Sequence, residues 1–234
     1  MRRILTILFL FCLVISTAYS QRNYLGLSFG GSLPSEEFAN KSVTEDGGYA
    51  EKGFVLEFSG AYIFDYYVGI TGTFTFSSNP PDRVQYGEDL KEAVPGPLPP
   101  DTEVDIKMGN WMYSNLMAGP IVTIPVWKLN FDFRGVAGLS FMLSPPQELY
   151  IISGEDEYFE RRSGKTVNFA YMFGTGIRFN VNQSYAIRLS ADYFRSKPSF
   201  DVDENGIVGS ITGKTSYDMN IGTLNINIGI AYRF

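Results

Sequence analysis

The alternation of side chains at the end of this chain constrains its fold more than any other feature. From Leu224 to Phe234 every second residue is a large apolar one, and the residues between them are polar, small or basic. Successive side chains of a β-strand point to opposite faces, so the segment predicts a strand with one apolar and one polar face. A strand of this kind that stops at an aromatic residue is typical of the closing strand of a barrel in lipid.

Similar alternation recurs along the chain after about residue 22. Each alternating segment has roughly the ten residues that a tilted strand needs to cross a bilayer. The segments are 23–31, 53–64, 67–76, 111–124, 129–142, 165–180, 185–194 and 217–234.

The connections between these segments alternate in length. Short turns join the second segment to the third, the fourth to the fifth and the sixth to the seventh, whereas long polar stretches join the others. Short periplasmic turns and long external loops are typical of outer-membrane barrels. The sequence therefore predicts an all-β fold, an eight-stranded antiparallel up-and-down transmembrane β-barrel with both termini in the periplasm. The long stretches are 32–52, 77–110, 143–164 and 195–216.

The register of the fourth segment stays open at this stage. Because successive side chains alternate between faces, only one of two apolar sets can face lipid. The competing sets are Leu116, Ala118 and Val122 on one side and Trp111, Met117 and Ile121 on the other.

The start of the chain has the pattern of an export signal. Basic residues 2–3 precede an apolar run over 4–15, and 18–20 has the small-x-small pattern of a signal-peptidase site. The apolar run is short for a transmembrane helix, which needs roughly twenty residues. We therefore predict a cleaved signal peptide over 1–20 and a mature barrel domain over 21–234.

The polar faces of the predicted strands carry isolated charges of both signs, which a lipid face could not hold. In a soluble barrel, the alternative fold, charged side chains would point outward into water. Here they stand among small and polar residues, which suits a crowded lumen better. Paired charges would plug an eight-stranded interior, which side chains just fill; the alternative is a line of charge for a transported ion. The predicted lumen network is Glu57, Asp132, Arg134, Arg178, Arg188, Asp192 and Arg233.

The signal peptide and the ending 229–234, Gly-Ile-Ala-Tyr-Arg-Phe, carry a resemblance. With the eight segments they resemble the small outer-membrane barrels of the OmpA-transmembrane and OmpX-like class, and more specifically the outer membrane protein β-barrel domain family that includes PorT-like proteins. The resemblance implies a bacterial outer membrane with lipopolysaccharide, and insertion by the barrel-assembly machinery. Ile230, Tyr232 and Phe234 match the assembly signal of such barrels. Full-length OmpA proteins add a periplasmic peptidoglycan-binding domain, which we do not expect here.

Several chemistries are disfavoured by composition. The chain has no histidine, the usual general base or acid of hydrolytic enzymes, and its one cysteine, Cys12, lies in the predicted signal peptide. The usual zinc ligands are therefore missing, and we expect no enzyme activity and no cofactor. The net charge is −6, or about −8 without Arg2 and Arg3, which argues against nucleic acid as a partner.

One segment partly matches a calcium-binding loop. Residues 201–206, Asp-Val-Asp-Glu-Asn-Gly, place oxygen ligands at alternate positions with glycine sixth, but Thr212 stands where a bidentate carboxylate is needed. The favoured alternative is a hairpin whose turn is Asn205-Gly206, which would extend the last two strands beyond the membrane.

The sequence says less about function than about fold. The external stretches hold most of the acidic excess, which fits either a solvated surface or a docking surface for a protein partner or for divalent cations that bridge lipopolysaccharide. We expect a monomeric, non-enzymatic barrel with an envelope-structural role or an interaction role through its loops. The alternatives are an accessory barrel of a protein secretion complex, as in PorT-like proteins, and a narrow porin.

Overall fold

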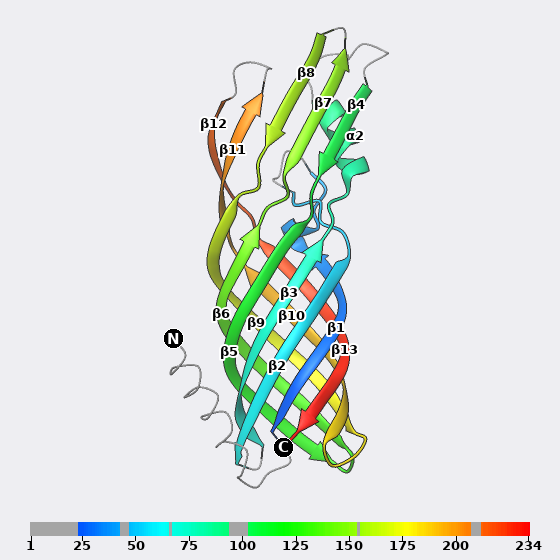
Figure 1. Ribbon diagram of the computed structural model, residues 1–234, viewed down its shortest axis with the longest axis vertical. Coiled ribbons are helices and arrows are strands. Elements are labelled where there is room, and N and C mark those ends of the chain that lie inside the picture. The colour runs from blue at the N-terminus through cyan, green and yellow to red at the C-terminus, as the bar shows by residue number, and fades with distance from the viewer. Residues whose placement is uncertain (1–22, 43–46, 66, 94–102, 154, 207–211) are drawn as a thin grey trace, which may run out of the picture.

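Eight antiparallel strands form a closed barrel in the computed structural model (Figure 1). The structure describes residues 23–42, 47–65, 67–93, 103–153, 155–206 and 212–234, so the predicted signal peptide lies outside the described residues. Neighbouring barrel strands follow the chain, and β1 pairs with β13 to close the ring. The predicted fold class is confirmed. The barrel strands are β1 (Tyr24–Ser35), β2 (Gly53–Asp65), β3 (Val68–Asn79), β5 (Trp111–Val126), β6 (Leu129–Leu143), β9 (Lys165–Asn180), β10 (Tyr185–Ser196) and β13 (Ile221–Arg233).

The register left open in the fourth predicted strand is resolved in β5. Leu116 points outward with 61% of its surface exposed, whereas Trp111 and Met117 are buried inside the barrel. The indole nitrogen of Trp111 donates a hydrogen bond to the backbone oxygen of Gly48 at 3.0 Å. A polar partner at the mouth therefore accounts for an indole that faces inward.

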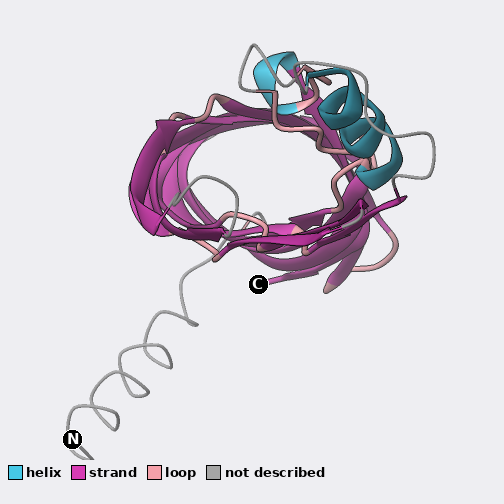
Figure 2. Cartoon of the chain, turned by 90° about the horizontal axis from the view of Figure 1, so that it is seen from above, coloured by secondary structure: helices cyan, strands magenta, loops and turns pink. Residues whose placement is uncertain are grey.

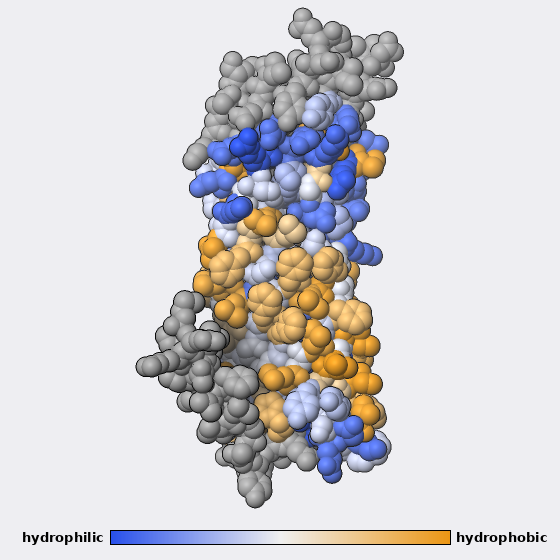
Figure 3. All heavy atoms as spheres, in the orientation of Figure 1, coloured by the Kyte–Doolittle hydropathy of each residue, from blue (hydrophilic) through white to orange (hydrophobic). Residues whose placement is uncertain are grey.

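The barrel wall is apolar on the outside and polar on the inside. A belt of hydrophobic side chains surrounds its middle and lower part, with hydrophilic residues above and below (Figure 3). Serine, threonine, asparagine and charged residues of the same strands are buried within. A soluble barrel has the opposite arrangement, so the apolar outer surface is the one that faces lipid. Exposed members of the belt include Leu27, Phe58, Phe74, Phe133, Leu139, Phe173, Leu189, Ile228 and Ile230.

Five barrel strands continue above the belt as a second, open sheet. Its order, β12-β11-β8-β7-β4, repeats the order of the barrel strands to which each is joined, β13-β10-β9-β6-β5. The wall on this side is thus prolonged outward as a half-cylinder, which we call the half-pipe (Figure 1). The half-pipe strands are β4 (Glu103–Met108), β7 (Gln147–Ser153), β8 (Glu155–Arg161), β11 (Ser199–Gly206) and β12 (Thr212–Asp218).

The half-pipe corrects two expectations about the external stretches. They were predicted as loops, with one extended hairpin between the last two barrel strands, yet most of their described residues form paired strands. The hairpin of β11 and β12 exists, but Asn205 pairs with Thr212 and Gly206 with Phe159, so the prediction of an Asn205-Gly206 turn is wrong. Pairing with β8 extends β11 through Asn205 and Gly206, the residues that favour a turn.

The open side of the half-pipe is covered by the connection after β1 and by the part of the connection after β3 that precedes β4, so both helices lie on one side of the ring (Figure 2). The short helix η2 (Glu36–Phe38) follows β1, and helix α2 (Arg83–Ala93) follows β3. Asp82 caps α2 by accepting a hydrogen bond from the backbone nitrogen of Gln85 at 3.1 Å. Lys41 also contacts Asp82, with 2.5 Å between Nζ and Oδ2, and so ties the two connections together. No helix among the described residues is long and apolar enough to span a membrane.

A charge placed in the middle of the belt tests the lipid-facing assignment. Leu189, exposed in the middle of β10, should tolerate arginine poorly: we expect Leu189→Arg to lower the free energy of unfolding by about 2–4 kcal/mol, because a cation at the bilayer midplane loses its hydration. Urea titration of protein folded into lipid vesicles measures this loss. Val84→Arg on the exposed face of α2 is the control and should change stability little. Equal effects of the two variants would contradict the assignment.

Candidate functional site: a sealed lumen and an external chamber

A buried arginine connects two carboxylates across the lumen. Arg134 donates from Nη2 to Glu57 Oε2 at 2.7 Å and to Asp192 Oδ1 at 2.8 Å, and from Nε to the same Asp192 oxygen at 2.9 Å. Arg188 donates to the other Glu57 oxygen at 2.8 Å and to Ser59 at 2.5 Å. These contacts join β2, β6 and β10 through the barrel interior.

A second ion pair lies nearer the turn end of the barrel. Arg178 contacts Asp132 through two hydrogen bonds, of 2.6 Å from Nε and 2.9 Å from Nη2, the bidentate geometry that makes arginine–carboxylate pairs strong. Thr123 donates to the same carboxylate at 2.7 Å. The guanidinium of Arg178 also lies 4.0 Å from the ring centre of Tyr24, a cation–π contact.

A glycine in the barrel wall leaves room for the ion pair of Arg134 and Asp192. At Gly174 a Cβ atom would lie 1.8 Å from Asp192 Oδ1 and 3.0 Å from Arg134 Nε. Any side chain at this position would therefore displace the ion pair. Glycine is required here for space, and the ion pair lies directly against the strand.

The network holds six of the seven charged residues predicted for the lumen. Each is at most 5% exposed, and they are also all the buried charged residues in the part of the chain that the structure describes. Three carboxylates face three guanidiniums, so the site is formally neutral. Arg233 does not join them: at the end of β13 it donates to the backbone oxygen of Asn182 at 3.3 Å. Ser59, Thr123 and Tyr24, which complete the network, were not singled out from the sequence, although they lie on the same polar faces.

An aromatic cluster closes the outer end of the lumen. Phe38 of η2 is fully buried, with its ring centre 5.5 Å from that of Trp111 and 6.5 Å from that of Tyr113. Tyr113 stacks on Phe194 at 5.5 Å, and Trp111 contacts Phe200 at 5.7 Å. The connection after β1 therefore folds back over the mouth and seals it. We call these five residues the aromatic cap.

The turn end of the lumen has its own closure. Small and apolar side chains from five strands pack together around the ring of Tyr24 below the ion pairs. The lumen thus consists of stacked layers that fill the interior of an eight-stranded barrel, as expected for this strand number. The turn-end layer is Tyr24, Ala61, Ile63, Ile121, Ala186 and Ala231.

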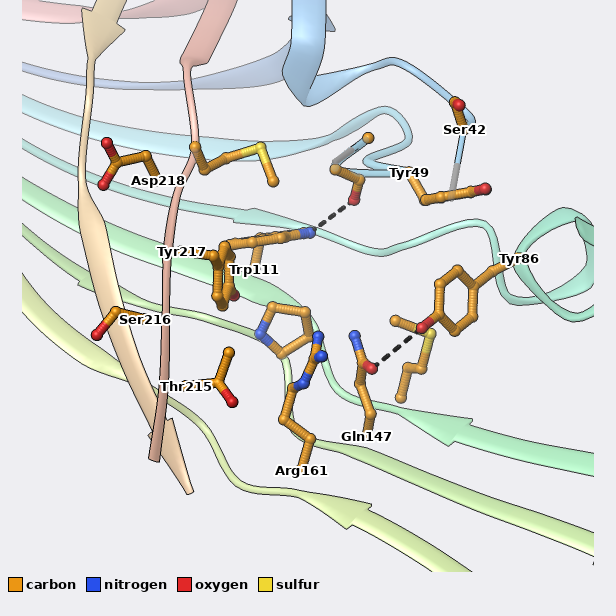
Figure 4. A pocket seen from close by; sticks show the side chains of 15 residues that line it. Ser42, Tyr49, Tyr86, Trp111, Gln147, Arg161, Thr215, Ser216, Tyr217 and Asp218 are labelled. Atoms are coloured by element: carbon orange, nitrogen blue, oxygen red, sulfur yellow. Dashed lines mark hydrogen bonds between the residues drawn. The ribbon is translucent and has the colours of Figure 1, made fainter. Parts of the chain in front are cut away.

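Above the aromatic cap, the half-pipe and its covering connections enclose a cavity of about 580 Å³ (Figure 4). We call it the external chamber. Its walls come from the connection after β1, from α2 and from four of the five half-pipe strands or their ends. Side chains and backbone that line it are Ser42, Gly47, Gly48, Tyr49, Tyr86, Met108, Trp111, Pro145, Gln147, Arg161, Thr215, Ser216, Tyr217, Asp218 and Met219.

Hydrogen bonds and ring contacts fix the chamber walls. Tyr49 donates to Asp89 at 2.7 Å and packs edge-on against Tyr86 with ring centres 5.0 Å apart. Burial, together with the hydrogen bond to Asp89, raises the pKa of Tyr49, so its hydroxyl stays a neutral donor. Tyr86 reaches from α2 to Gln147 on β7, with 3.3 Å between their oxygens (Figure 4). The covering helix is thereby tied to the half-pipe across the cavity.

Arg161 at the end of β8 is the cationic side chain that lines the chamber, and it lies next to Tyr217 of β12. The Arg161 guanidinium lies 5.8 Å from the ring centre of Tyr217, and its side chain points into the cavity between Gln147 and Thr215 (Figure 4). No sequence signal pointed to this chamber, because its residues come from separate connections. Among the described residues no group of three or more His, Cys, Asp or Glu side chains is placed to hold a metal ion.

In a closed barrel every strand is hydrogen-bonded to a neighbour on each side, so the backbone groups pair within the wall, as a membrane-spanning sheet requires. The outer face of this wall is apolar, and its buried charges are paired. The chain is a transmembrane β-barrel of the outer-membrane type. The bacterial outer-membrane location implied by the sequence resemblance agrees with this architecture. The signal-peptide boundary, and the role of Ile230, Tyr232 and Phe234 in assembly, stay predictions; in the barrel the first two point outward and Phe234 stacks on Tyr232.

Comparison with known proteins finds similarity to solved structures at low sequence identity. No family model and no curated protein matches the chain. Among solved structures it is similar to the attachment invasion locus protein Ail of Yersinia pestis, with 17% identity, a TM-score of 0.41 and coverage of 91% of this chain and 99% of that one. It is similar to OprG of Pseudomonas aeruginosa with 12% identity and a TM-score of 0.48, and the match covers 91% of this chain and 95% of that one. It is also similar to the outer membrane protease OmpT of Escherichia coli with 7% identity and a TM-score of 0.42, and the match covers 94% of this chain and 99% of that one.

Removal of the central arginine tests the lumen network. Arg134→Ala should lower the free energy of unfolding by about 3–5 kcal/mol, because Glu57 and Asp192 would be left buried without their shared partner. Arg162→Ala, which removes an exposed guanidinium beside Glu160, is the control and should cost about 0–1 kcal/mol. Denaturant titration in lipid vesicles measures both. A loss for Arg134→Ala no larger than for the control would show that the network does not stabilise the barrel.

Proposed function

We propose that this protein is a non-enzymatic, non-conducting outer-membrane barrel that acts by binding at its external end. The observation that carries the proposal is the external chamber, which is assembled from six separate external segments above a sealed lumen. Binding residues on connections held by a rigid scaffold are a common arrangement in proteins. The half-pipe makes that scaffold continuous with the membrane-spanning wall.

The filled lumen argues against the porin alternative. An ion would have to pass the aromatic cap, the neutral ion-pair layer and the turn-end layer, and each of these is buried. Moving Arg134 and Arg188 aside would leave Glu57 unpaired in a buried site, which is unfavourable. A steady aqueous path therefore requires disruption of the contacts that join opposite walls.

The residues available for chemistry argue against an enzyme. The chain lacks histidine, and the buried carboxylates of the lumen are each engaged by arginine and closed off from the exterior by the aromatic cap. In the chamber the charged lining residues are Arg161 and Asp218, and neither histidine nor cysteine, the usual base and nucleophile of acyl transfer, is among the lining residues. Binding is the role that these residues support best.

A second candidate function, as an accessory barrel of a secretion complex, is favoured by the edge of the half-pipe. β12 is the outermost strand of that sheet and pairs on one side with β11. An exposed edge strand offers backbone hydrogen-bonding groups to an extended segment of a partner protein. At the other edge, β4 lies against α2 (Figure 1). A protein partner that adds a strand would therefore bind along β12.

Planar-bilayer recordings test the sealed lumen. We expect purified, folded protein to show little or no steady conductance, because side chains fill the interior. Phe38→Ala is the informative variant, since it opens the aromatic cap yet leaves the ion-pair layer in place, and it should remain closed. Large, stable channels from the wild-type protein in a clean preparation would contradict the proposal and favour the porin alternative.

Replacement of one chamber wall tests external binding. A variant in which a Gly-Ser linker replaces residues 83–102 loses α2 and Tyr86 but none of the barrel strands. We expect it to keep its heat-dependent mobility on SDS gels, which reports a folded barrel, and to lose the molecules recovered with the wild-type protein from cross-linked, detergent-solubilised envelopes. Equal recovery of the same molecules by a folded variant would place the interaction surface elsewhere.

A further inference from the structure

We propose that the external chamber binds a short saccharide of one or two sugar rings. This inference rests on the proposed binding role of the external end and adds the class of ligand. A cavity of about 580 Å³ lies within the range of roughly 300–1,000 Å³ that is usual for small-molecule sites. It is large enough for a disaccharide and too small for a folded domain.

The chamber offers apolar ring surfaces on several sides. Tyr217 on β12 and Tyr86 on α2 are half-buried and present ring surface to the cavity from different walls, whereas Trp111 at the floor and Tyr49 behind Tyr86 line it with little exposed surface (Figure 4). A pyranose ring has flat C–H faces that pack on aromatic rings and hydroxyl groups around its edge. Aromatic side chains with a polar handle suit such a ligand, because they bury apolar area and keep hydrogen-bonding groups available.

The polar lining matches the edge of a sugar ring. Arg161 and Gln147 carry planar groups that can bind two neighbouring hydroxyls at once, and Thr215 adds a hydroxyl of its own. On β12, Ser216 and Asp218 alternate with Thr215 and Tyr217 and point away from the cavity (Figure 4), and Ser216 donates a hydrogen bond to Asp201 on the outer face of β11. Arg161 is therefore the charged side chain that points into the chamber, which favours a neutral or singly negative saccharide over a polyanion, because a polyanion would need several cations.

Two other ligand classes fit less well. A lipid acyl chain would need a lining without polar groups at the level of the apolar belt, whereas the chamber lies above that belt and carries charged and hydroxyl side chains. A divalent cation would need several carboxylates, and no group of three acidic residues among the described part of the chain is suitably placed.

The walls are held in place before any ligand arrives. Trp111 is fixed by its hydrogen bond to Gly48, Tyr49 by its bond to Asp89, and Tyr86 by its contact with Gln147. Side chains that are already ordered lose little conformational entropy on binding, so a small ligand can bind without large rearrangement. The chamber is therefore a preformed site.

The chain supplies its own reporter for chamber occupancy. It has two tryptophans, Trp111 in the chamber floor and Trp127 in an exposed turn at the opposite end of the barrel. In a Trp127→Phe background, tryptophan fluorescence reports Trp111 alone. The probes are the methyl glycosides of glucose, galactose, N-acetylglucosamine and glucuronic acid, and disaccharides of the same sugars, with sorbitol as a non-cyclic polyol control.

We expect a saturable change in Trp111 emission with at least one of these saccharides and none with sorbitol. Arg161→Ala and Tyr217→Ala should each weaken binding about tenfold or more, equivalent to about 1.4 kcal/mol. The matched controls Arg162→Ala, directly after β8, and Tyr150→Ala, on β7, alter the same residue types outside the chamber lining and should leave affinity unchanged. Heat-dependent mobility confirms that each variant is folded.

Three results would overturn the saccharide assignment. They are no saturable response to any probe, equal weakening by chamber and control variants, or a response to a mixture of short peptides but to no sugar. Each of these leaves the proposed binding role intact if replacement of residues 83–102 still abolishes recovery of bound molecules. Loss of the saccharide response with unchanged recovery would instead separate the chamber from the main interaction surface.

Discussion

The contacts of Arg134 with Glu57 and Asp192 are the interaction on which the rest of this structure depends. They join strands from different parts of the chain across an interior without bulk water, where an unpaired charge is far costlier than at a surface. Their neutrality allows apolar and aromatic layers to close the lumen above and below.

The external end follows from the same wall. Five strands pass from the belt into the half-pipe without changing their order, so the chamber is positioned by the barrel itself. Proline and glycine mark several of the junctions, including Gly109, Pro146, Gly164 and Pro198. Proline has no backbone N–H donor and glycine has no side chain, so either residue readily interrupts the hydrogen-bond ladder between strands. Such interruptions let the sheet depart from the curvature of the closed barrel.

Much of the membrane-spanning part could be predicted from the sequence, because lipid imposes a strict two-residue alternation. All eight strands and the six buried charges are found on the expected faces. Alternation failed for β5, where Trp111 and Leu116 are both apolar and a hydrogen bond to Gly48 decides which faces inward. Above the membrane, water wets both faces, so the pattern weakens; Asn205-Gly206, a favoured turn pair, was overridden by pairing with β8 and β12. The chamber depends on long-range contacts that no local pattern encodes.

The aromatic cap has a consequence for the order in which the molecule assembles. Phe38 follows the first strand, yet its partners Trp111 and Tyr113 lie far along the chain, and Tyr113 in turn stacks on Phe194 of β10. Contacts between distant parts of a chain form late, after the intervening segments have been brought together. The cap can therefore form only once β1, β5 and β10 have been brought together in the barrel, so closure of the outer mouth depends on the assembled wall.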